Sequence, residues 1–251
     1  MRASLGYSSP SVNGSVTFAS SSAPSLRLNL LDHFELWRDG RLIPLAVAIQ
    51  RLLAFLALRR RPVGRLFAAG TLWMDSSERR SSGSLRSALW RLRAEGLDLV
   101  EATPTQVGLA PTVVVDLEEA TTFAKALADR SATPLQEPLH AGPLTKDLLP
   151  DWYDDWVLIE RERYRHIRLR ALEALCERLT QEGRFALAIE TGLAAVSTEP
   201  LRESAHRVLI MTHLAEGNLS EAIRQFRMLR DLLRTELGVE PPEDLAALVR
   251  S

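Results

Sequence analysis

Cysteine, lysine and long apolar runs are scarce in this sequence, and each shortage excludes a class of protein. Cys176 is the only cysteine among 251 residues. No internal disulfide framework can therefore form, which fits a reducing compartment. No run of about 18 apolar residues occurs, so we expect no membrane-spanning helix. The first residues lack a basic stretch followed by an apolar one, so we do not expect secretion. The composition predicts a cytoplasmic, globular protein.

Lysine and histidine are too few and too dispersed for the common catalytic and metal-binding motifs. Lys125 and Lys146 are the only lysines, and no GxxxxGK[ST] sequence exists, which excludes a P-loop ATPase. The five histidines never fall at HxxxH or HExxH spacing, and one cysteine cannot build a cysteine-rich zinc site. We interpret His206 and His213 as surface residues of one helix, and Cys176 as a buried structural thiol. We expect no catalytic site, no metal and no cofactor.

The small net charge of −1 hides an asymmetry between the two halves of the chain. Residues 26–110 hold 13 arginines and 8 carboxylates, a balance of +5. Residues 111–251 hold 17 basic and 24 acidic residues, a balance of −7. A basic half joined to an acidic half indicates two domains, of which the first faces a polyanion.

The start of the chain reads as a disordered segment followed by a small sheet and helices. Residues 1–25 are rich in serine and show no periodicity, so we expect disorder up to Leu26. Apolar residues then alternate over 26–45, and Asp39-Gly40 between two such runs is a hairpin signal. Residues 46–60 have helical apolar spacing, 63–73 are consistent with a second short helix, and 75–83 read as a polar loop.

A third helix and a second hairpin complete the pattern of a winged helix-turn-helix. The stretch "GSLRSALWRLRAEG" (83–96) is helical and ends at Gly96, a plausible C-terminal cap. Residues 97–117 form two apolar runs around the turn 103–105, which predicts a hairpin directly after that helix. The order of sheet, three helices and hairpin is that of a winged helix, whose third helix enters the DNA major groove.

The rest of the chain is predicted to be almost wholly helical, with a repeat. Residues 131–153 contain four prolines and are expected to be irregular. Gly183 and Gly217 lie 34 residues apart, as do Ala188 and Ala222. A 34-residue period of helix pairs is typical of tetratricopeptide repeats. We therefore predict a mainly α protein with a small β component, in which a winged helix-turn-helix (26–115) precedes a tetratricopeptide-like α-helical domain (116–251).

The third helix carries an arginine-rich face that matches the basic half. Its apolar residues Leu85, Ala88, Leu89 and Leu92 share one stripe and are expected to be buried. Five arginines occur between positions 79 and 93 with no acid among them, which disfavours an ordinary solvated helix with internal ion pairs. Arginine can fork onto guanine or phosphate, and serine can bond phosphates or base edges. The candidate DNA-binding residues are Arg79, Arg80, Ser84, Arg86, Ser87, Trp90, Arg91, Arg93 and, in the hairpin, Gln106. For Trp90, packing against the wing is an equally good alternative.

Several motifs in one order resemble a known family. They are "GTLWMDSSERRSSGSLRSALWRLR", "LLPDWYDDWVLIERER", "EPLRESAHRVLIMTHLAEGN" and "ELGVEP". Together they resemble the Streptomyces antibiotic regulatory proteins, transcriptional activators that join a response-regulator-type winged helix to a bacterial transcriptional activation domain. The resemblance spans roughly residues 26–250.

The resemblance implies partners and roles that the residues alone do not give. It implies homodimers on direct repeats of double-stranded DNA in promoters, often in biosynthetic clusters, with contacts to RNA polymerase and its sigma factor. It also implies a nucleoid-associated location. The loop before the third helix would help to touch polymerase; its residues are Asp75, Ser76, Ser77 and Glu78. The wing departs from the family, because Gln106 and Gly108 stand where basic residues are common.

Two functions from different classes remain open at this point. The first is a sequence-specific DNA-binding transcriptional activator. The second is a tetratricopeptide adaptor for protein partners, in which the winged helix is only a scaffold. Steep salt dependence of DNA affinity would separate them, because counterion release accompanies DNA binding alone.

Overall fold

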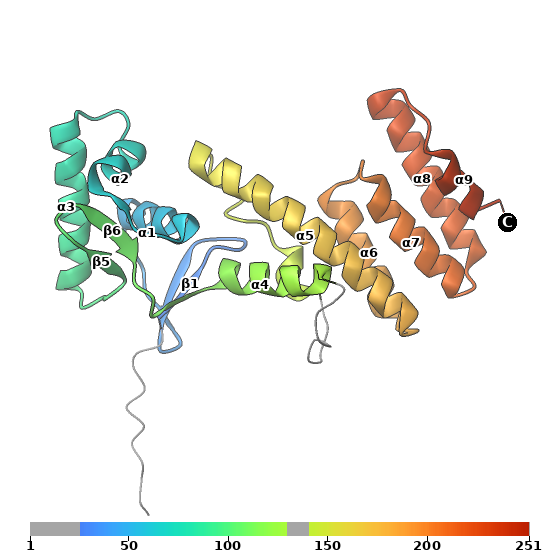
Figure 1. Ribbon diagram of the computed structural model, residues 1–251, viewed down its shortest axis with the longest axis horizontal. Helices are drawn as coiled ribbons and strands as arrows, with labels where there is room; N and C mark the ends of the chain where they lie inside the picture. Colours follow the sequence, from blue (N-terminus) through green and yellow to red (C-terminus); the bar gives the residue numbers. More distant parts are fainter. Residues whose placement is uncertain (1–25, 130–140, 251) are drawn as a thin grey trace, which may run out of the picture.

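The computed structural model describes residues 26–129 and 141–250. The expected disorder of residues 1–25 and part of the irregular stretch 131–153 lie outside the described residues. Figure 1 shows an elongated molecule, with a small mixed α/β part at one end and helices stacked toward the other. None of the helices in the described ranges is both long and apolar enough to cross a membrane.

The first sheet is built on the predicted hairpin and closed by a strand that we did not predict. Its strands, in the order β3-β2-β1-β7, are β1 (Leu26–Asn29), β2 (Glu35–Arg38), β3 (Arg41–Leu42) and β7 (Val113–Val115). Asp39 and Gly40 have φ of 50° and 75°, as a two-residue hairpin turn requires. The valines of β7 pair in parallel with β1, so the sheet is mixed rather than purely antiparallel.

Three helices and a second sheet form the winged helix. The helices are α1 (Val47–Arg59), α2 (Arg65–Leu72) and α3 (Glu78–Ala94). The second sheet has the order β4-β6-β5, from β4 (Val63–Gly64), β5 (Val100–Ala102) and β6 (Gln106–Leu109). The hairpin β5–β6 is the predicted wing. The predicted helix over 63–73 is two residues too long at its start, because Val63 and Gly64 pair with β6.

The remaining helices are stacked as antiparallel neighbours. They are α4 (Asp116–Ala128), the short 3₁₀ helix η1 (Gly142–Thr145), α5 (Asp155–Gln181), α6 (Phe185–Thr198), α7 (Glu203–Ala215), α8 (Leu219–Leu237) and α9 (Glu243–Leu248). Gly183 and Gly217 have φ of 72° and 86° at the turns after α5 and α7, and Ala188 and Ala222 are fully buried. The predicted helical repeat is therefore present, whereas its assignment as tetratricopeptide stays a prediction.

The polar residues expected on the surface of the repeat helices are instead buried between them. His206 is fully buried: its Nε2 lies 2.9 Å from the Pro200 carbonyl and its Nδ1 2.8 Å from Nε2 of Gln225. His213 is also buried, so the surface interpretation of both histidines is wrong. The helical period placed them on one face, but that face is covered by neighbouring helices. Cys176 is buried as predicted, and its thiol donates to the Ala188 carbonyl.

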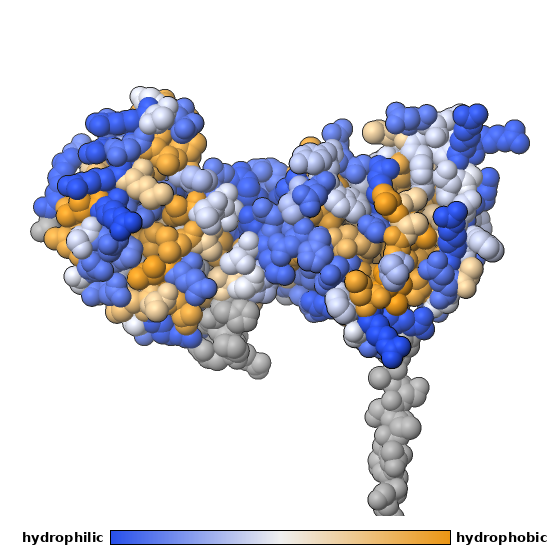
Figure 2. Space-filling model, turned by 180° about the vertical axis from the view of Figure 1, so that it is seen from behind, coloured by the Kyte–Doolittle hydropathy of each residue, from blue (hydrophilic) through white to orange (hydrophobic). Residues whose placement is uncertain are grey.

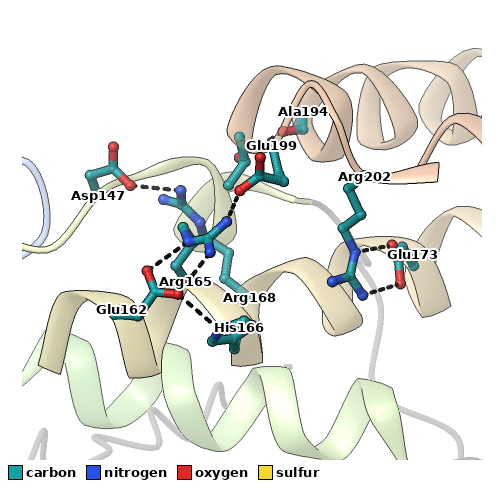
Figure 3. Close-up of polar contacts among 10 residues, drawn as sticks. Asp147, Glu162, Arg165, His166, Arg168, Glu173, Ala194, Glu199 and Arg202 are labelled. Carbon is teal, nitrogen blue, oxygen red and sulfur yellow. Dashed lines mark hydrogen bonds and ion pairs between the residues drawn. The ribbon is translucent and has the colours of Figure 1, made fainter. Parts of the chain in front are cut away.

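Ion pairs along α5 tie this helix to its neighbours. Figure 3 shows Arg165 between Glu162 of the same helix and Glu199, which lies after α6. Farther along, Arg202 pairs with Glu173, with Nε and Oε1 2.6 Å apart. Helix α5 is therefore tied to the segment between α6 and α7.

The core of the winged helix continues across residue 115 into α4 and α5. Leu117 and Ala120 of α4, and Val157 and Tyr164 of α5, belong to the same buried cluster as the leucines of β1 and α1. Trp156 of α5 meets Phe55 of α1 edge to face, with ring centroids 5.4 Å apart. The start of the repeat part is therefore packed directly onto the winged helix.

Candidate nucleic-acid interface

Helix α3 begins earlier than the sequence predicts, and this changes the loop before it. The amides of Arg80 and Ser81 bond the Ser77 carbonyl at 2.8 and 2.9 Å, so the helix starts at Glu78. The serine-rich composition of 75–83 indicated a loop, but Ser81 is buried and its hydroxyl donates to the Glu78 carbonyl. The expectation that Glu78 belongs to the loop is therefore wrong.

The two faces of α3 differ sharply in burial. Leu85, Ala88, Leu89 and Leu92 are buried, as the helical period predicts. The predicted contact residues on α3 lie on the other side, with Ser84 half-buried and the others exposed: Arg79, Arg80, Arg86, Ser87, Trp90, Arg91 and Arg93. The buried leucines fix the rotation of the helix, and that rotation presents the arginines to solvent.

The arginines of this face are not paired with carboxylates. Within the described ranges, none of the five α3 arginines makes an ion pair, whereas arginines of α5 pair with acids of the same helix, such as Arg163 with Glu160. The acids Glu78 and Glu95 stand at the two ends of the helix and leave its middle uniformly basic. A row of unpaired guanidinium groups has a positive potential that attracts a polyanion.

Trp90 projects from the middle of the arginine face. Its side chain is 70% exposed, and the described aromatic rings make no stacking contact with it. The alternative that Trp90 packs against the wing is therefore wrong. A large indole held in solvent is available for contact with a partner.

The wing lies beside the first half of α3, and next to its turn is one basic residue of α2 that the sequence did not reveal. Gln106, at the start of β6, is exposed near the wing turn. Arg65 lies at the first position of α2, where its Nη1 donates to the Thr103 carbonyl at 3.1 Å and its amide to the Thr105 carbonyl at 2.9 Å. A cleft of about 550 Å³ runs between Arg65, the wing turn and Arg86. We missed Arg65 because only the strand pairing β4–β6 places it at the wing.

The packing of the wing explains why a glycine stands at position 108, independently of DNA binding. Gly108 is buried in β6, and a Cβ there would lie 3.3 Å from the backbone Cα of Pro62. A side chain at this position would require Pro62 to shift. The departure from the family at Gly108 therefore reflects packing of the wing on the α1–β4 segment.

The residues between α2 and α3 form an exposed loop. Asp75, Ser76 and Ser77 are exposed, and Met74 beside them is 73% exposed. The flexible side chain of methionine can adapt to varied partners.

No group of three or more histidine, cysteine or carboxylate side chains in the described ranges is placed to hold a metal ion.

The fold and this surface define a class of protein: a winged helix with a free basic third helix, followed by helical repeats. Comparison with known proteins agrees with that class. The family model of the bacterial transcriptional activator domain matches residues 137–251. The chain is 29% identical to the regulatory protein AfsR of Streptomyces coelicolor and 27% identical to AfsR of Streptomyces griseus, over 89% and 90% of its own length.

The fold is also found in a solved structure. That structure is Mycobacterium tuberculosis EmbR in complex with a low-affinity phosphopeptide, with a TM-score of 0.70 and 23% identity over 90% of this chain and 64% of the other. The chain spans 24% of the length of each AfsR protein. These matches agree with the resemblance to the Streptomyces antibiotic regulatory proteins that the motifs indicated.

Proposed function

We propose that the protein is a sequence-specific DNA-binding transcriptional activator, and that α3 reads the DNA. The observation that carries this proposal is the exposed face of α3, where five arginines without an ion pair in the described ranges surround a 70% exposed Trp90. The match of residues 137–251 to the bacterial transcriptional activator domain supports the same function. In a winged helix the third helix lies in the major groove, which brings this face to the base edges.

The side chains of α3 make different kinds of contact with DNA, according to their position on the helix. Arg79 and Arg80, in the first turn, neutralise phosphates and set the register of the helix. Arg86 and Arg91, nearer the middle, are placed to fork onto base edges such as guanine O6 and N7. Trp90 packs on a sugar or a thymine methyl group, and Ser84, Ser87 and Arg93 complete the contact surface.

The wing anchors the DNA backbone with little positive charge of its own. Gln106 offers a neutral amide there, so the cation at the wing comes from Arg65 of α2. Its guanidinium is already oriented by the Thr103 carbonyl and needs little ordering to meet a phosphate. This contact would take the place of basic residues in the wing itself.

Activation follows from the surfaces that the DNA leaves uncovered. The exposed loop of Asp75, Ser76 and Ser77 lies at the N-terminal end of α3, where it can reach a polymerase or sigma factor bound at the adjacent promoter. Two copies on direct repeats would form a homodimer that presents this loop twice. In vitro transcription with purified polymerase tests this step: replacing the three loop residues by alanine should lower transcription while DNA affinity stays unchanged.

Fluorescence anisotropy on DNA from upstream of neighbouring genes, over a series of salt concentrations, tests the DNA-binding function. Binding that weakens steeply with salt, and that Arg65→Ala weakens on every sequence tested, is the expected result. Arg224→Ala on α8, with a side chain 80% exposed, is the matched control and should have no effect. Absence of binding at low salt would favour the protein adaptor instead.

A further inference from the structure

A second basic cleft lies where the winged helix meets the repeat helices. It has a volume of about 310 Å³ and lies between the end of α1, α4 and α5. Its charged lining residues are Arg59, Arg60, Arg61, Lys125, Arg163 and Glu160. Leu117, Tyr164 and Ile167 form part of its floor. Figure 2, which views the molecule from behind, shows a largely hydrophilic surface over this middle region, between more apolar areas at the two ends.

The cations of this cleft are not neutralised by its single carboxylate. Glu160 is held by Arg163, with its two oxygens 2.8 and 2.9 Å from Nη1. Within the described ranges, the other four cations make no ion pair. Arg59 instead lies over the rings of Phe55 and Phe67, and Arg60 bonds the hydroxyl of Thr121 at 3.4 Å. Such an excess of positive charge in a cleft attracts an anion.

One residue of the arginine run has a left-handed backbone conformation. Arg60 has φ of 55°, in the left-handed region that favours glycine, and its amide closes the end of α1 on the Leu56 carbonyl. An arginine is therefore kept where glycine would be easier. Residues in such conformations cluster at functional sites.

The cleft faces away from the proposed DNA-reading surface. Figure 1 shows α1 between α3 on one side and α5 on the other, and the cleft is on the α5 side of α1. A duplex held along the exposed face of α3 would lie beyond the opposite side of α1. The cleft is also small, so its charge suits a free anion better than a continuous nucleic-acid backbone.

We infer that this cleft binds the phosphate group of a small phosphorylated compound. Arginine forks match phosphate oxygens, and Lys125 adds a point charge from the opposite wall. Ile167 and the rest of the floor accept a small apolar portion of the ligand. Since Arg59–Arg61 belong to the winged helix and Lys125 to α4, a bound phosphate holds the two parts together, which gives the protein a site for an effector.

Isothermal titration with phenyl phosphate, at constant ionic strength in a buffer free of phosphate, tests this inference. The variant is Arg61→Ala with Lys125→Ala, because both side chains are exposed and, within the described ranges, neither makes a side-chain hydrogen bond or an ion pair. Arg224→Ala with Arg227→Ala on α8 removes the same charge elsewhere. We expect the cleft variant to bind about tenfold more weakly or worse and the α8 variant to bind like the wild type.

Three results would overturn the inference. One is wild-type affinity in the cleft variant, and a second is equal weakening in the α8 variant, which would show non-specific charge attraction. The third is binding of phthalate, a dicarboxylate, with no binding of phenyl phosphate. Thermal unfolding gives an independent readout, because a ligand of the folded state raises the Tm of the wild type and not of the cleft variant. DNA affinity should be the same for both variants; a selective loss in the cleft variant would make the cleft a DNA contact.

Discussion

At the scale of single residues, charge and burial on α3 decide which side chains are available to DNA. The buried leucines set the rotation of the helix, and the arginines opposite them have no carboxylate partners in the described ranges. The periodicity of the sequence was enough to identify both faces. It could not place Arg65, whose position at the wing depends on the pairing of Val63 with Val107.

Arg86→Ala and Arg91→Ala should each weaken specific DNA binding by about 1–3 kcal/mol, the loss of one bidentate base contact. Arg79→Ala should instead weaken binding to specific and unrelated DNA alike, because a phosphate contact carries no sequence information. Competition titrations with both kinds of DNA measure the difference. Equal affinity for all three variants and the wild type would contradict the assignment of α3.

His206 should make the stability of the protein depend on pH. Burial lowers the pKa of His206 below its usual value of 6.5, so the unfolded chain takes up the proton more readily than the folded one. The free energy of unfolding contributed by this residue is therefore complete above pH 6.5 and falls as the pH decreases below it. Urea denaturation between pH 7.5 and 5.5 measures this loss of stability, which for one proton is at most about 1.4 kcal/mol per pH unit.

His206→Gln is the comparison for that pH series. Glutamine has no proton to gain in this range, so the variant should lose less stability than the wild type on acidification, even if it starts lower. A wild type and variant with parallel pH curves would show that His206 does not contribute.

At the scale of helices and strands, the repeat helices and the hairpins can be predicted from their own sequence patterns. The short strands cannot, because they form only where another strand pairs with them. The period of α5 to α8 and the Asp39-Gly40 turn were sufficient to predict those elements. Strand β4 has two residues and β7 three, and each exists only because β6 or β1 lies beside it. The start of α3 could not be predicted because serine is typical of loops, whereas Ser81 is buried within the helix.

Gly192 on α6 should be intolerant of a methyl group. A Cβ there would lie 3.1 Å from Cδ1 of Leu209 and 3.3 Å from Sγ of Cys176, so α6 would be pushed from its neighbours. Gly192→Ala should destabilise the protein by about 1–3 kcal/mol through overpacking. Gly70→Ala on α2 is the control, because nothing lies within 4 Å of a Cβ there and alanine favours the helix. Urea denaturation of the two variants checks this; an unchanged Gly192→Ala variant would contradict the close packing.

At the scale of the whole molecule, the winged helix and the first repeat helices share one core. Arg51 of α1 bonds Asp154, at the start of α5, at 2.5 Å, and donates to the Leu72 carbonyl at the end of α2. Trp152 stacks on Phe34 and meets Trp156 edge to face. The change in charge balance near residue 110 predicted a boundary between two domains. The apolar contacts that cross this boundary could not be predicted from the sequence. The domain limits 26–115 and 116–251 remain a prediction.

Trp156→Ala should destabilise both parts of the molecule together. Trp156 is buried between α1 and α5, and its loss should cost about 3–5 kcal/mol. Far-UV circular dichroism and DNA-binding activity should then fall in one coincident transition. Trp90→Ala, which removes an exposed ring, should leave stability within about 0.5 kcal/mol of the wild type. Separate transitions for the two probes would contradict a shared core.

The most direct test of the central claim, that α3 reads promoter DNA, is a hydroxyl-radical footprint on upstream DNA with wild-type protein and with Arg86→Ala. The account predicts two protected stretches in direct repeat with the wild type, separated by about one helical turn of 10–10.5 base pairs or a multiple of it. It also predicts that Arg86→Ala removes this protection at the same protein concentration. A footprint that survives in Arg86→Ala, or wild-type protein that protects no site at low salt, would contradict it.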